Sequence, residues 1–288
     1  MNYTSALFFS LLPFAGIAQL GQSTNYVDAE TIAFYSSAVK DTFTVSIQLP
    51  KEYNTSPDTR YPIVVLLDGD FYFPTMAPVM RQYEMTGLLP PMILVGIGYG
   101  SFHKMDSLRV RDFLYPESLE TDEMTAPGGG KDFYQFLSRE LLPNLESKLR
   151  VDTLQRSLLG HSFGGYFALY ALLQQASEGR SVFSNIVAAS PTLWYHDFYL
   201  NRLPDTLHTA SRENPINIFM TAGDLENTEW TLNPIYRLTT SFKKQNSAQL
   251  YLNTVMFNFL DHMDTGQLSF IKGLQNFSQP RYMIAENR

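Results

Sequence analysis

The sequence predicts an α/β protein built on a mostly parallel central sheet, with helices on both faces and an antiparallel edge at the N-terminal side. Short, continuously apolar runs recur along the chain, and such runs are typical of strands buried on both faces of a parallel sheet. Stretches with helical spacing separate the later runs, as expected where crossover helices join parallel strands. Two earlier runs alternate between polar and apolar residues, which indicates an antiparallel edge.

Each predicted element can be placed along the chain. The alternating strands are expected at 31–39 and 42–50, and the apolar strands at 63–69, 92–98, 157–162, 186–190, 216–223 and 250–257. Helical spacing of large apolar residues is clearest over 133–149, 167–173 and 230–242. No internal repeat or linker interrupts this order, so we expect a single domain over residues 19–288.

The composition narrows the class of protein. The chain has 288 residues, of which 44% are hydrophobic, and its formal net charge is −7. Its lysines and arginines are scattered and form no basic stripe of the kind that nucleic-acid binding needs, so we expect no nucleic-acid partner. The absence of cysteine excludes disulfides, thiolate catalysis and cysteine-ligated zinc.

The N-terminus contains a candidate signal peptide. Ala6–Ala18 is an uncharged apolar stretch that ends in Gly16-Ile17-Ala18, with small residues at the two positions that a signal peptidase reads. A buried first helix is an alternative, whereas a transmembrane anchor would need about 20 apolar residues. We expect residues 1–18 to be removed on export, leaving a periplasmic or secreted chain that is not inserted in a membrane.

One short motif indicates the chemistry. Gly160-His161-Ser162-Phe163-Gly164 joins an apolar strand to a long apolar helix, which is the setting of a Gly-x-Ser-x-Gly nucleophile elbow. The elbow holds its serine at positive φ, and the turn closes only if the flanking residues lack side chains. The serine hydroxyl then lies at a helix N-terminus, where amide groups stabilise negative charge. Ser162 is therefore the candidate nucleophile, and a glycine-rich turn with a capping serine is the alternative.

A serine nucleophile needs a neighbouring base, and the chain has five histidines. His161 lies inside the elbow and is expected to pack structurally. His103 precedes the serine in the chain. In proteins with this elbow the catalytic residues follow the chain order serine, acid, histidine, so His103 is excluded. His196 and His208 come before the strand at 216–223, whereas His262 follows the last strand. His262 is the expected general base.

The third member should be a carboxylate in the loop after the strand at 216–223. It would hold the imidazole in one tautomer and stabilise the imidazolium. The loop contains Asp224, Glu226 and Glu229. We expect Glu226 to be the acid and keep Asp224 as the alternative, since Asp224 could instead cap the following helix. A serine–histidine dyad without a strong acid is a further alternative.

Two backbone amides should form the oxyanion hole. The amide of Phe163, directly after the serine, is one expected donor. The other should come from the loop after the strand at 63–69, at Asp70 or Phe71, because Gly69 lets the backbone approach the site. Asp68 in the same loop is expected to accept hydrogen bonds that stabilise the loop.

Six segments together resemble the putative-esterase branch of the α/β hydrolases, which includes trilactone siderophore esterases. They are VLLDGDFYF, RVRDFLYP, GGGKDFYQFLSRELLPNLESKLR, LLGHSFGGYFALYALL, AASPTLWY and TAGDLENT, in the order found in that family. The resemblance runs from about residue 30 to about residue 275. It implies an α/β-hydrolase fold, Ser162 as nucleophile, His262 as base, and Glu226 or Asp224 as acid. Tyr115 stands directly before Pro116 in the RVRDFLYP segment, where the family often has threonine, so substrate contacts there are expected to differ.

The resemblance also suggests pocket residues. Trp194 and Tyr195, which follow the AASPTL segment, are expected to line the substrate pocket, with core packing as the alternative. Arg109 and Arg111 could bind an anionic substrate, but pairing of such an arginine with a carboxylate such as Asp112 is the favoured role.

The expected function is that of an exported serine esterase that cleaves a small-molecule carboxylic ester through an acyl-enzyme intermediate. No cofactor or metal is expected, since the serine, histidine and acid supply the nucleophile and the base themselves. A siderophore trilactone esterase is a narrower alternative, although no basic cluster suits a triply anionic iron chelate. A catalytically silent hydrolase fold acting as a binding module is the alternative from another class. The sequence carries no signal for an oligomeric state.

Overall fold

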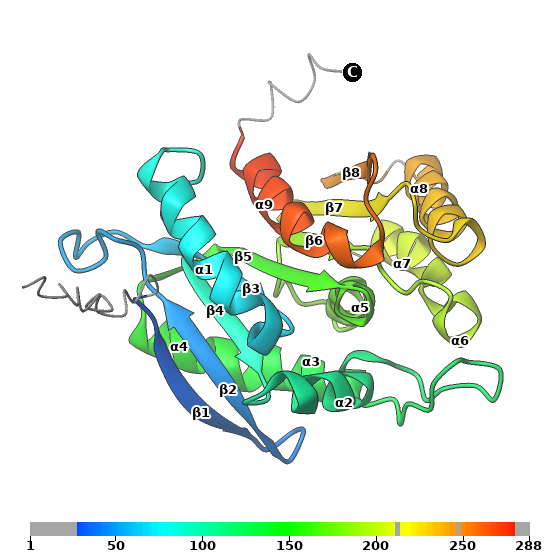
Figure 1. The fold of residues 1–288 in the computed structure, drawn as a ribbon, viewed down its shortest axis with the longest axis horizontal. Coiled ribbons are helices and arrows are strands. Elements are labelled where there is room, and N and C mark those ends of the chain that lie inside the picture. Colours follow the sequence, from blue (N-terminus) through cyan, green and yellow to red (C-terminus); the bar gives the residue numbers. More distant parts are fainter. Residues whose placement is uncertain (1–27, 211–213, 246, 248, 280–288) are drawn as a thin grey trace, which may run out of the picture.

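The computed structural model describes residues 28–210, 214–245, 247 and 249–279, and Figure 1 shows their arrangement. The predicted signal peptide, residues 1–18, lies outside the described residues. Within the described part of the chain, no helix combines the length and the apolar composition that spanning a bilayer requires.

Eight strands form one sheet in the order β1-β2-β4-β3-β5-β6-β7-β8. β1 pairs with β2, and β2 with β4, in antiparallel fashion, and all the remaining pairs are parallel. This confirms the mostly parallel sheet and its antiparallel N-terminal edge, and every predicted strand overlaps an observed one. The strands are β1 (Glu30–Ser36), β2 (Asp41–Gln48), β3 (Tyr61–Leu66), β4 (Ile93–Gly98), β5 (Val151–His161), β6 (Asn185–Ala189), β7 (Ile216–Gly223) and β8 (Leu250–Phe257).

Helices cover both faces of the sheet, as the alternation of strands and helices predicts. α1 (Gly69–Met85) and α9 (Thr265–Ser278) pack on one face, and Figure 1 shows them on its near side. The larger core cluster lies on the other face. Its helices are α2 (Phe102–Phe113), α3 (Gly130–Gln135), α4 (Leu142–Lys148), α5 (Phe163–Ser177), α7 (Leu203–Thr209) and α8 (Asn233–Gln245), with a π-helical segment (Phe136–Leu141) between α3 and α4.

Helix α1 was not evident from the sequence, and its composition explains why. It contains Pro74 and Pro78, and an interior proline removes a helical hydrogen bond and usually ends a helix. Here the helix continues past both prolines because tertiary packing supports it. The side chains of Phe73, Met76 and Met80 are buried against the sheet.

The parallel strands bring the functional segments to one edge of the sheet. β3, β5, β6, β7 and β8 all run in the same direction, so their carboxyl ends lie at that edge. In open α/β sheets, ligands bind in the crevice beyond these ends. The segments that follow β3, β5, β7 and β8 carry the oxyanion, nucleophile, acid and base candidates respectively.

Candidate active site

The turn between β5 and α5 consists of one residue, the candidate nucleophile. β5 ends at His161 and α5 begins at Phe163, and Ser162 between them has φ 59° and ψ −119°. A serine is rarely held in this region of backbone space, and such strain occurs chiefly at functional positions. The Ser162 amide donates to the Ala189 carbonyl at 2.9 Å, and the Ser162 carbonyl accepts from the Tyr166 amide at 2.9 Å. The backbone is therefore fixed on both sides of the hydroxyl.

The flanking glycines are required by close backbone approach. A Cβ on Gly160 would lie 2.0 Å from the Gly164 carbonyl oxygen, and one on Gly165 would lie 2.8 Å from the Ala189 carbonyl oxygen. Both distances are well inside van der Waals contact, and backbone atoms cannot move aside cheaply. The steric argument from the sequence therefore holds for Gly160, whereas a Cβ on Gly164 would meet nothing closer than the Asp68 side chain, at 3.2 Å.

The candidate base and acid are in direct contact. His262 lies after β8, immediately before α9, and its Nδ1 is 2.8 Å from Glu226 Oε2. A carboxylate can only accept, so Nδ1 carries the proton and Nε2 keeps its lone pair. Glu226 is buried, and its Oε1 accepts from the Ser190 hydroxyl at 2.6 Å and from the Gly223 amide at 2.8 Å. This arrangement leaves Nε2 as the ring nitrogen able to take a proton.

The hydrogen bonds also fix the charge of the acid. Burial by itself raises the pKa of Glu226, but hydrogen bonds from His262, Ser190 and the Gly223 amide outweigh it and hold the pKa below its ordinary value of 4.5. Glu226 is therefore ionised at neutral pH, which is the state in which it can stabilise an imidazolium.

Asp224, the alternative acid, has a different partner. Its Oδ1 accepts from the Phe259 amide at 2.7 Å, and its own amide donates to the Phe257 carbonyl at 2.9 Å. The carboxylate is exposed and holds the chain after β8 in place. Of the two candidates, the structure brings Glu226 to the histidine.

The loop after β3 is tied to the nucleophile strand by a buried ion pair. Arg109 donates from Nε and Nη2 to the two oxygens of Asp68, both at 2.9 Å, and from Nη2 to the His161 carbonyl at 3.0 Å. Bidentate pairs of this kind combine strength with fixed geometry. One guanidinium therefore spans the two segments that carry the expected oxyanion donors. Asp68 is the loop-stabilising acceptor that the sequence predicts.

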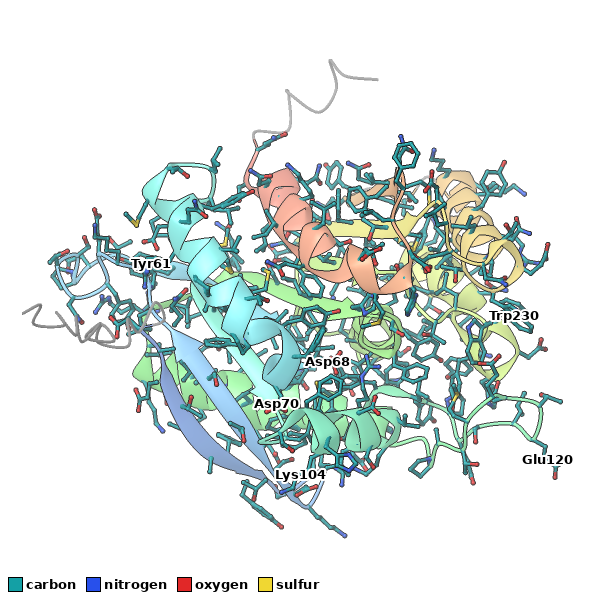
Figure 2. All side chains as sticks on the ribbon, viewed as in Figure 1. Tyr61, Asp68, Asp70, Lys104, Glu120 and Trp230 are labelled. Carbon is teal, nitrogen blue, oxygen red and sulfur yellow. The ribbon has the colours of Figure 1, made fainter. Side chains whose placement is uncertain are left out.

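The two oxyanion candidates in this loop differ in what their amides already bind. The Phe71 amide donates to the Asp68 carbonyl at 3.0 Å. The Asp70 amide lies in the first turn of α1, where no intrahelical acceptor exists. The Asp70 carboxylate accepts from the Tyr99 amide at 2.5 Å and the Gly100 amide at 3.0 Å, which anchors this turn to the chain after β4. Figure 2 shows Asp68 and Asp70 at that end of α1, where the Asp70 amide has no acceptor within the helix.

The predicted pocket residues separate into different environments. Tyr195 is 0% exposed and donates its hydroxyl to the Pro116 carbonyl at 2.6 Å, so the contacts favour the core-packing alternative. Trp194 packs edge-to-face on Trp230, with ring centroids 5.9 Å apart, and Trp230 is 51% exposed. Figure 2 shows Trp230 on the side of α8. Trp194 is partly buried and Trp230 is the exposed member of the pair, which the sequence offered no reason to select.

Arg111 takes the structural role that the sequence weighed against substrate binding. Its Nε and Nη2 donate to Asp112 at 2.7 and 2.9 Å, and its Nη1 donates to Asp41 at 2.8 Å. Every nitrogen of the guanidinium is therefore engaged within the protein. The sequence also suggested a place for Arg111 in the substrate pocket. In the structure it instead forms an ion-pair network between α2 and β2.

Ser190 is a site residue that sequence reasoning missed. It has φ 42°, is buried, and donates to the Glu226 carboxylate. Ser190 directly follows β6, and the end of β6 lies at the same edge of the sheet as Ser162. This position could have marked it as a site residue from the sequence. Ser190 binds Oε1 of Glu226, whereas His262 binds Oε2, so the two side chains together fix the carboxylate.

Comparisons with known proteins identify the family. Residues 36–251 match the family described as "Putative esterase". The chain is 31% identical over 219 residues to the ferri-bacillibactin esterase BesA of Bacillus subtilis, covering 72% of this chain and 74% of that protein. It is 29% identical over 244 residues to the apo-salmochelin esterase of Escherichia coli O6:H1, covering 78% and 71%.

A solved structure confirms the fold. The BES protein from Bacillus cereus superposes with a TM-score of 0.77 at 22% identity, covering 96% of this chain and 100% of that one. The family match spans most of the described residues and includes the elbow and the loop that carries Glu226. The chain therefore belongs to the putative-esterase family and is an esterase-type serine hydrolase with the α/β-hydrolase fold.

Proposed function

We propose that the chain hydrolyses the ester bonds of a siderophore-type trilactone, with Ser162 as nucleophile, His262 as general base and Glu226 as the orienting acid. The observation that carries this proposal is the 2.8 Å contact between His262 Nδ1 and Glu226 Oε2 in a chain that has a strained serine elbow. The substrate class is supported by two relatives that are named as siderophore esterases.

The geometry suggests the following acylation step. The Ser162 hydroxyl attacks the ester carbonyl while His262 Nε2 takes its proton, and the ionised Glu226 stabilises the imidazolium. The negative charge on the carbonyl oxygen is met by the amides of Phe163 and Asp70. Each such donor contributes on the order of 10² to 10³ in rate. His262 then protonates the leaving alcohol, and an acyl-enzyme remains on Ser162.

Deacylation repeats the same steps with water. His262 takes a proton from the water as it attacks the acyl-enzyme, and then returns that proton to Ser162. A trilactone has three equivalent ester bonds, so one active site opens the ring and can then hydrolyse the linear product. Trp230 is 51% exposed and packs edge-to-face on the partly buried Trp194, so its ring offers an apolar surface suited to an aromatic acyl substituent.

A general carboxylesterase with the same three residues is the second candidate. It is favoured by the ion pairs of Arg109 and Arg111, because no guanidinium of the pair is left to bind an anionic chelate. A hydrolysis screen separates the two candidates. The purified protein and Ser162→Ala are each given a metal-free catechol trilactone and p-nitrophenyl esters of graded chain length.

The proposal predicts that the wild type opens the trilactone and that Ser162→Ala does not. Activity on the p-nitrophenyl esters with no opening of the trilactone would favour the general esterase. Absence of any hydrolysis that depends on Ser162 would contradict both candidates and leave the binding-module alternative.

We also propose that residues 1–18 act as a signal peptide and that residues 19–288 form a single exported catalytic domain. The apolar stretch and its small terminal residues support the proposal. N-terminal sequencing of the protein recovered from the periplasm or medium should begin at Gln19. Recovery of a chain that begins at Met1 from the cytoplasm would overturn it.

A further inference from the structure

His161 is placed to do more than pack inside the elbow. Its side chain is 3% exposed, and its Nε2 lies 2.8 Å from the carbonyl oxygen of His262. The two imidazole rings are 4.7 Å apart between centroids. The residue that precedes the candidate nucleophile therefore binds the backbone of the candidate base.

The hydrogen bond has only one possible direction. A carbonyl oxygen accepts and never donates, so the proton must be on His161 Nε2. Thr265 Oγ1 lies 2.9 Å from the same carbonyl and 2.7 Å from Ser190 Oγ, and it can donate its one proton to either. Two side chains, one from β5 and one from α9, thus reach the main chain of His262.

The charge of His161 suits this task. Burial is the largest influence and, with the neighbouring His262, lowers the pKa of His161 to about 3. The ring is neutral at physiological pH and has a single N–H, which the contact assigns to Nε2. A cationic ring at this place would oppose the formation of an imidazolium on His262. His161 is therefore suited to positioning and unsuited to carrying protons.

The surroundings of His262 explain why such a contact is needed. Phe259 is 84% exposed and Met263 is 64% exposed, so little apolar packing holds this part of the chain. The contact with Glu226 fixes the orientation of the imidazole, and the His262 amide donates to Asp261 Oδ1 at 2.7 Å within the same exposed loop. The contact from His161 adds an anchor from the central sheet. A displacement of about 1 Å at a reacting group can cost on the order of 10²-fold in rate.

We propose that His161 is a positioning residue that sets the distance between the nucleophile and the base, by binding the His262 carbonyl through its neutral Nε2–H. Ser162 and His161 are consecutive, so any movement of the elbow is transmitted to the base along this hydrogen bond. The inference rests on the proposed roles of Ser162 and His262.

Two amide substitutions separate positioning from simple packing. In His161→Gln the side-chain nitrogen lies at the reach of histidine Nε2, whereas in His161→Asn it lies at the shorter reach of Nδ1. We expect His161→Gln to keep kcat within about threefold of wild type. We expect His161→Asn to lose about tenfold to 10²-fold in kcat, with KM changed by less than about threefold. The substrate for both is a p-nitrophenyl ester or the trilactone, whichever the wild type hydrolyses.

The outcomes are distinguishable from failure of the proposed function. If the wild type shows no hydrolysis that depends on Ser162, the proposed function fails first. If the wild type is active and the Gln and Asn variants lose kcat equally, or the Asn variant loses none, the positioning role is wrong.

A second pair of variants covers the case in which the His161 variants do not fold. Thr265→Val removes the hydroxyl that reaches both the His262 carbonyl and Ser190 Oγ, and Thr265→Ser keeps it. We expect Thr265→Val to lower kcat several-fold at nearly constant KM, and Thr265→Ser to restore it. Equal kcat values for the Val and Ser variants would overturn the proposal that this carbonyl must be held.

Discussion

The nucleophile and the base are held in place by different means. The elbow around Ser162 is buried and fixed by backbone hydrogen bonds and by glycines that admit no side chain. The base loop, residues 258–264, is largely exposed. It is held by its own capping box of Asp261 and Asp264, by the Leu225 amide on the Leu260 carbonyl, and by side chains from other segments. These are Asp224 on the Phe259 amide, Glu226 on the His262 ring and His161 on the His262 carbonyl.

The difference indicates which changes should cost stability and which should cost activity. A substitution in the elbow disturbs the packing of β5 against α5 and should destabilise the fold. A substitution among the side chains that hold the base loop should leave the fold intact and misplace the imidazole. The predictions below test this division, from the largest expected effect to the smallest.

Removal of the base itself should have the largest effect. We expect His262→Ala to lower kcat/KM for ester hydrolysis by about 10⁴-fold or more, because the serine hydroxyl then has no proton acceptor. Its melting temperature should stay close to that of wild type, since the ring is only partly buried. His208→Ala is the matched control, an exposed histidine in α7, and should retain wild-type rates.

The acid should come next, and its two candidates should differ. We expect Glu226→Gln to lower kcat by about 10² to 10⁴-fold, because the imidazolium loses its charge partner and the tautomer is no longer fixed. Asp224→Asn should lower kcat by less than about fivefold, since that carboxylate binds the Phe259 amide only. Steady-state kinetics on one ester would check both, and a larger loss in Asp224→Asn would reverse the assignment.

In the elbow, the effect should appear as lost stability. A Cβ on Gly160 would lie 2.0 Å from the Gly164 carbonyl oxygen, so Gly160→Ala should destabilise the fold by roughly 3 kcal/mol or more. Gly179→Ala is the control, because Gly179 has φ 62° but no atom within 4 Å of an added Cβ. Its cost should be about 1 kcal/mol, from the backbone conformation alone. Thermal denaturation would compare the two, and equal shifts in melting temperature would argue against steric closure of the elbow.

The smallest effect, within the first pH unit below 6.5, concerns pH. The pKa of His161 falls from an ordinary 6.5 to about 3 on folding, so the unfolded chain binds an extra proton between these values. Stability is complete above pH 6.5 and is lost as the pH falls toward 3, at up to about 1.4 kcal/mol per pH unit. The charged and titratable groups near His161 are Arg109, Tyr72, Glu226 and His262. All four are present both in wild type and in His161→Gln. Wild type should lose melting temperature more steeply than His161→Gln below pH 6.5, and parallel curves would contradict the buried neutral ring.

The sequence was most informative where structure is local. The strands and the elbow depend on runs of neighbouring residues, and the sequence predicted them. Helix α1 was obscured by Pro74 and Pro78, since its stability comes from packing on the sheet. The choice between Glu226 and Asp224 was also open, because two carboxylates two residues apart differ only in where the backbone points them.

The same limit applies to His161 and Trp230. The sequence suggested only a packing role for His161, because its partner lies 101 residues away and is a backbone carbonyl. Trp230 lies in a π-helical segment, Thr228–Leu232, and packs on Trp194, which follows β6. Such pairings follow from the order of the strands in the sheet, which no short segment of sequence specifies.

The most direct test of the central claim, that Ser162 is a nucleophile activated by His262, is covalent labelling with a fluorophosphonate followed by mass spectrometry of the digested protein. The account predicts one adduct, on the peptide that contains Ser162. It should be absent from Ser162→Ala, and formed at least about 10²-fold more slowly in His262→Ala. An adduct on another residue, or equal labelling of wild type and Ser162→Ala, would contradict it.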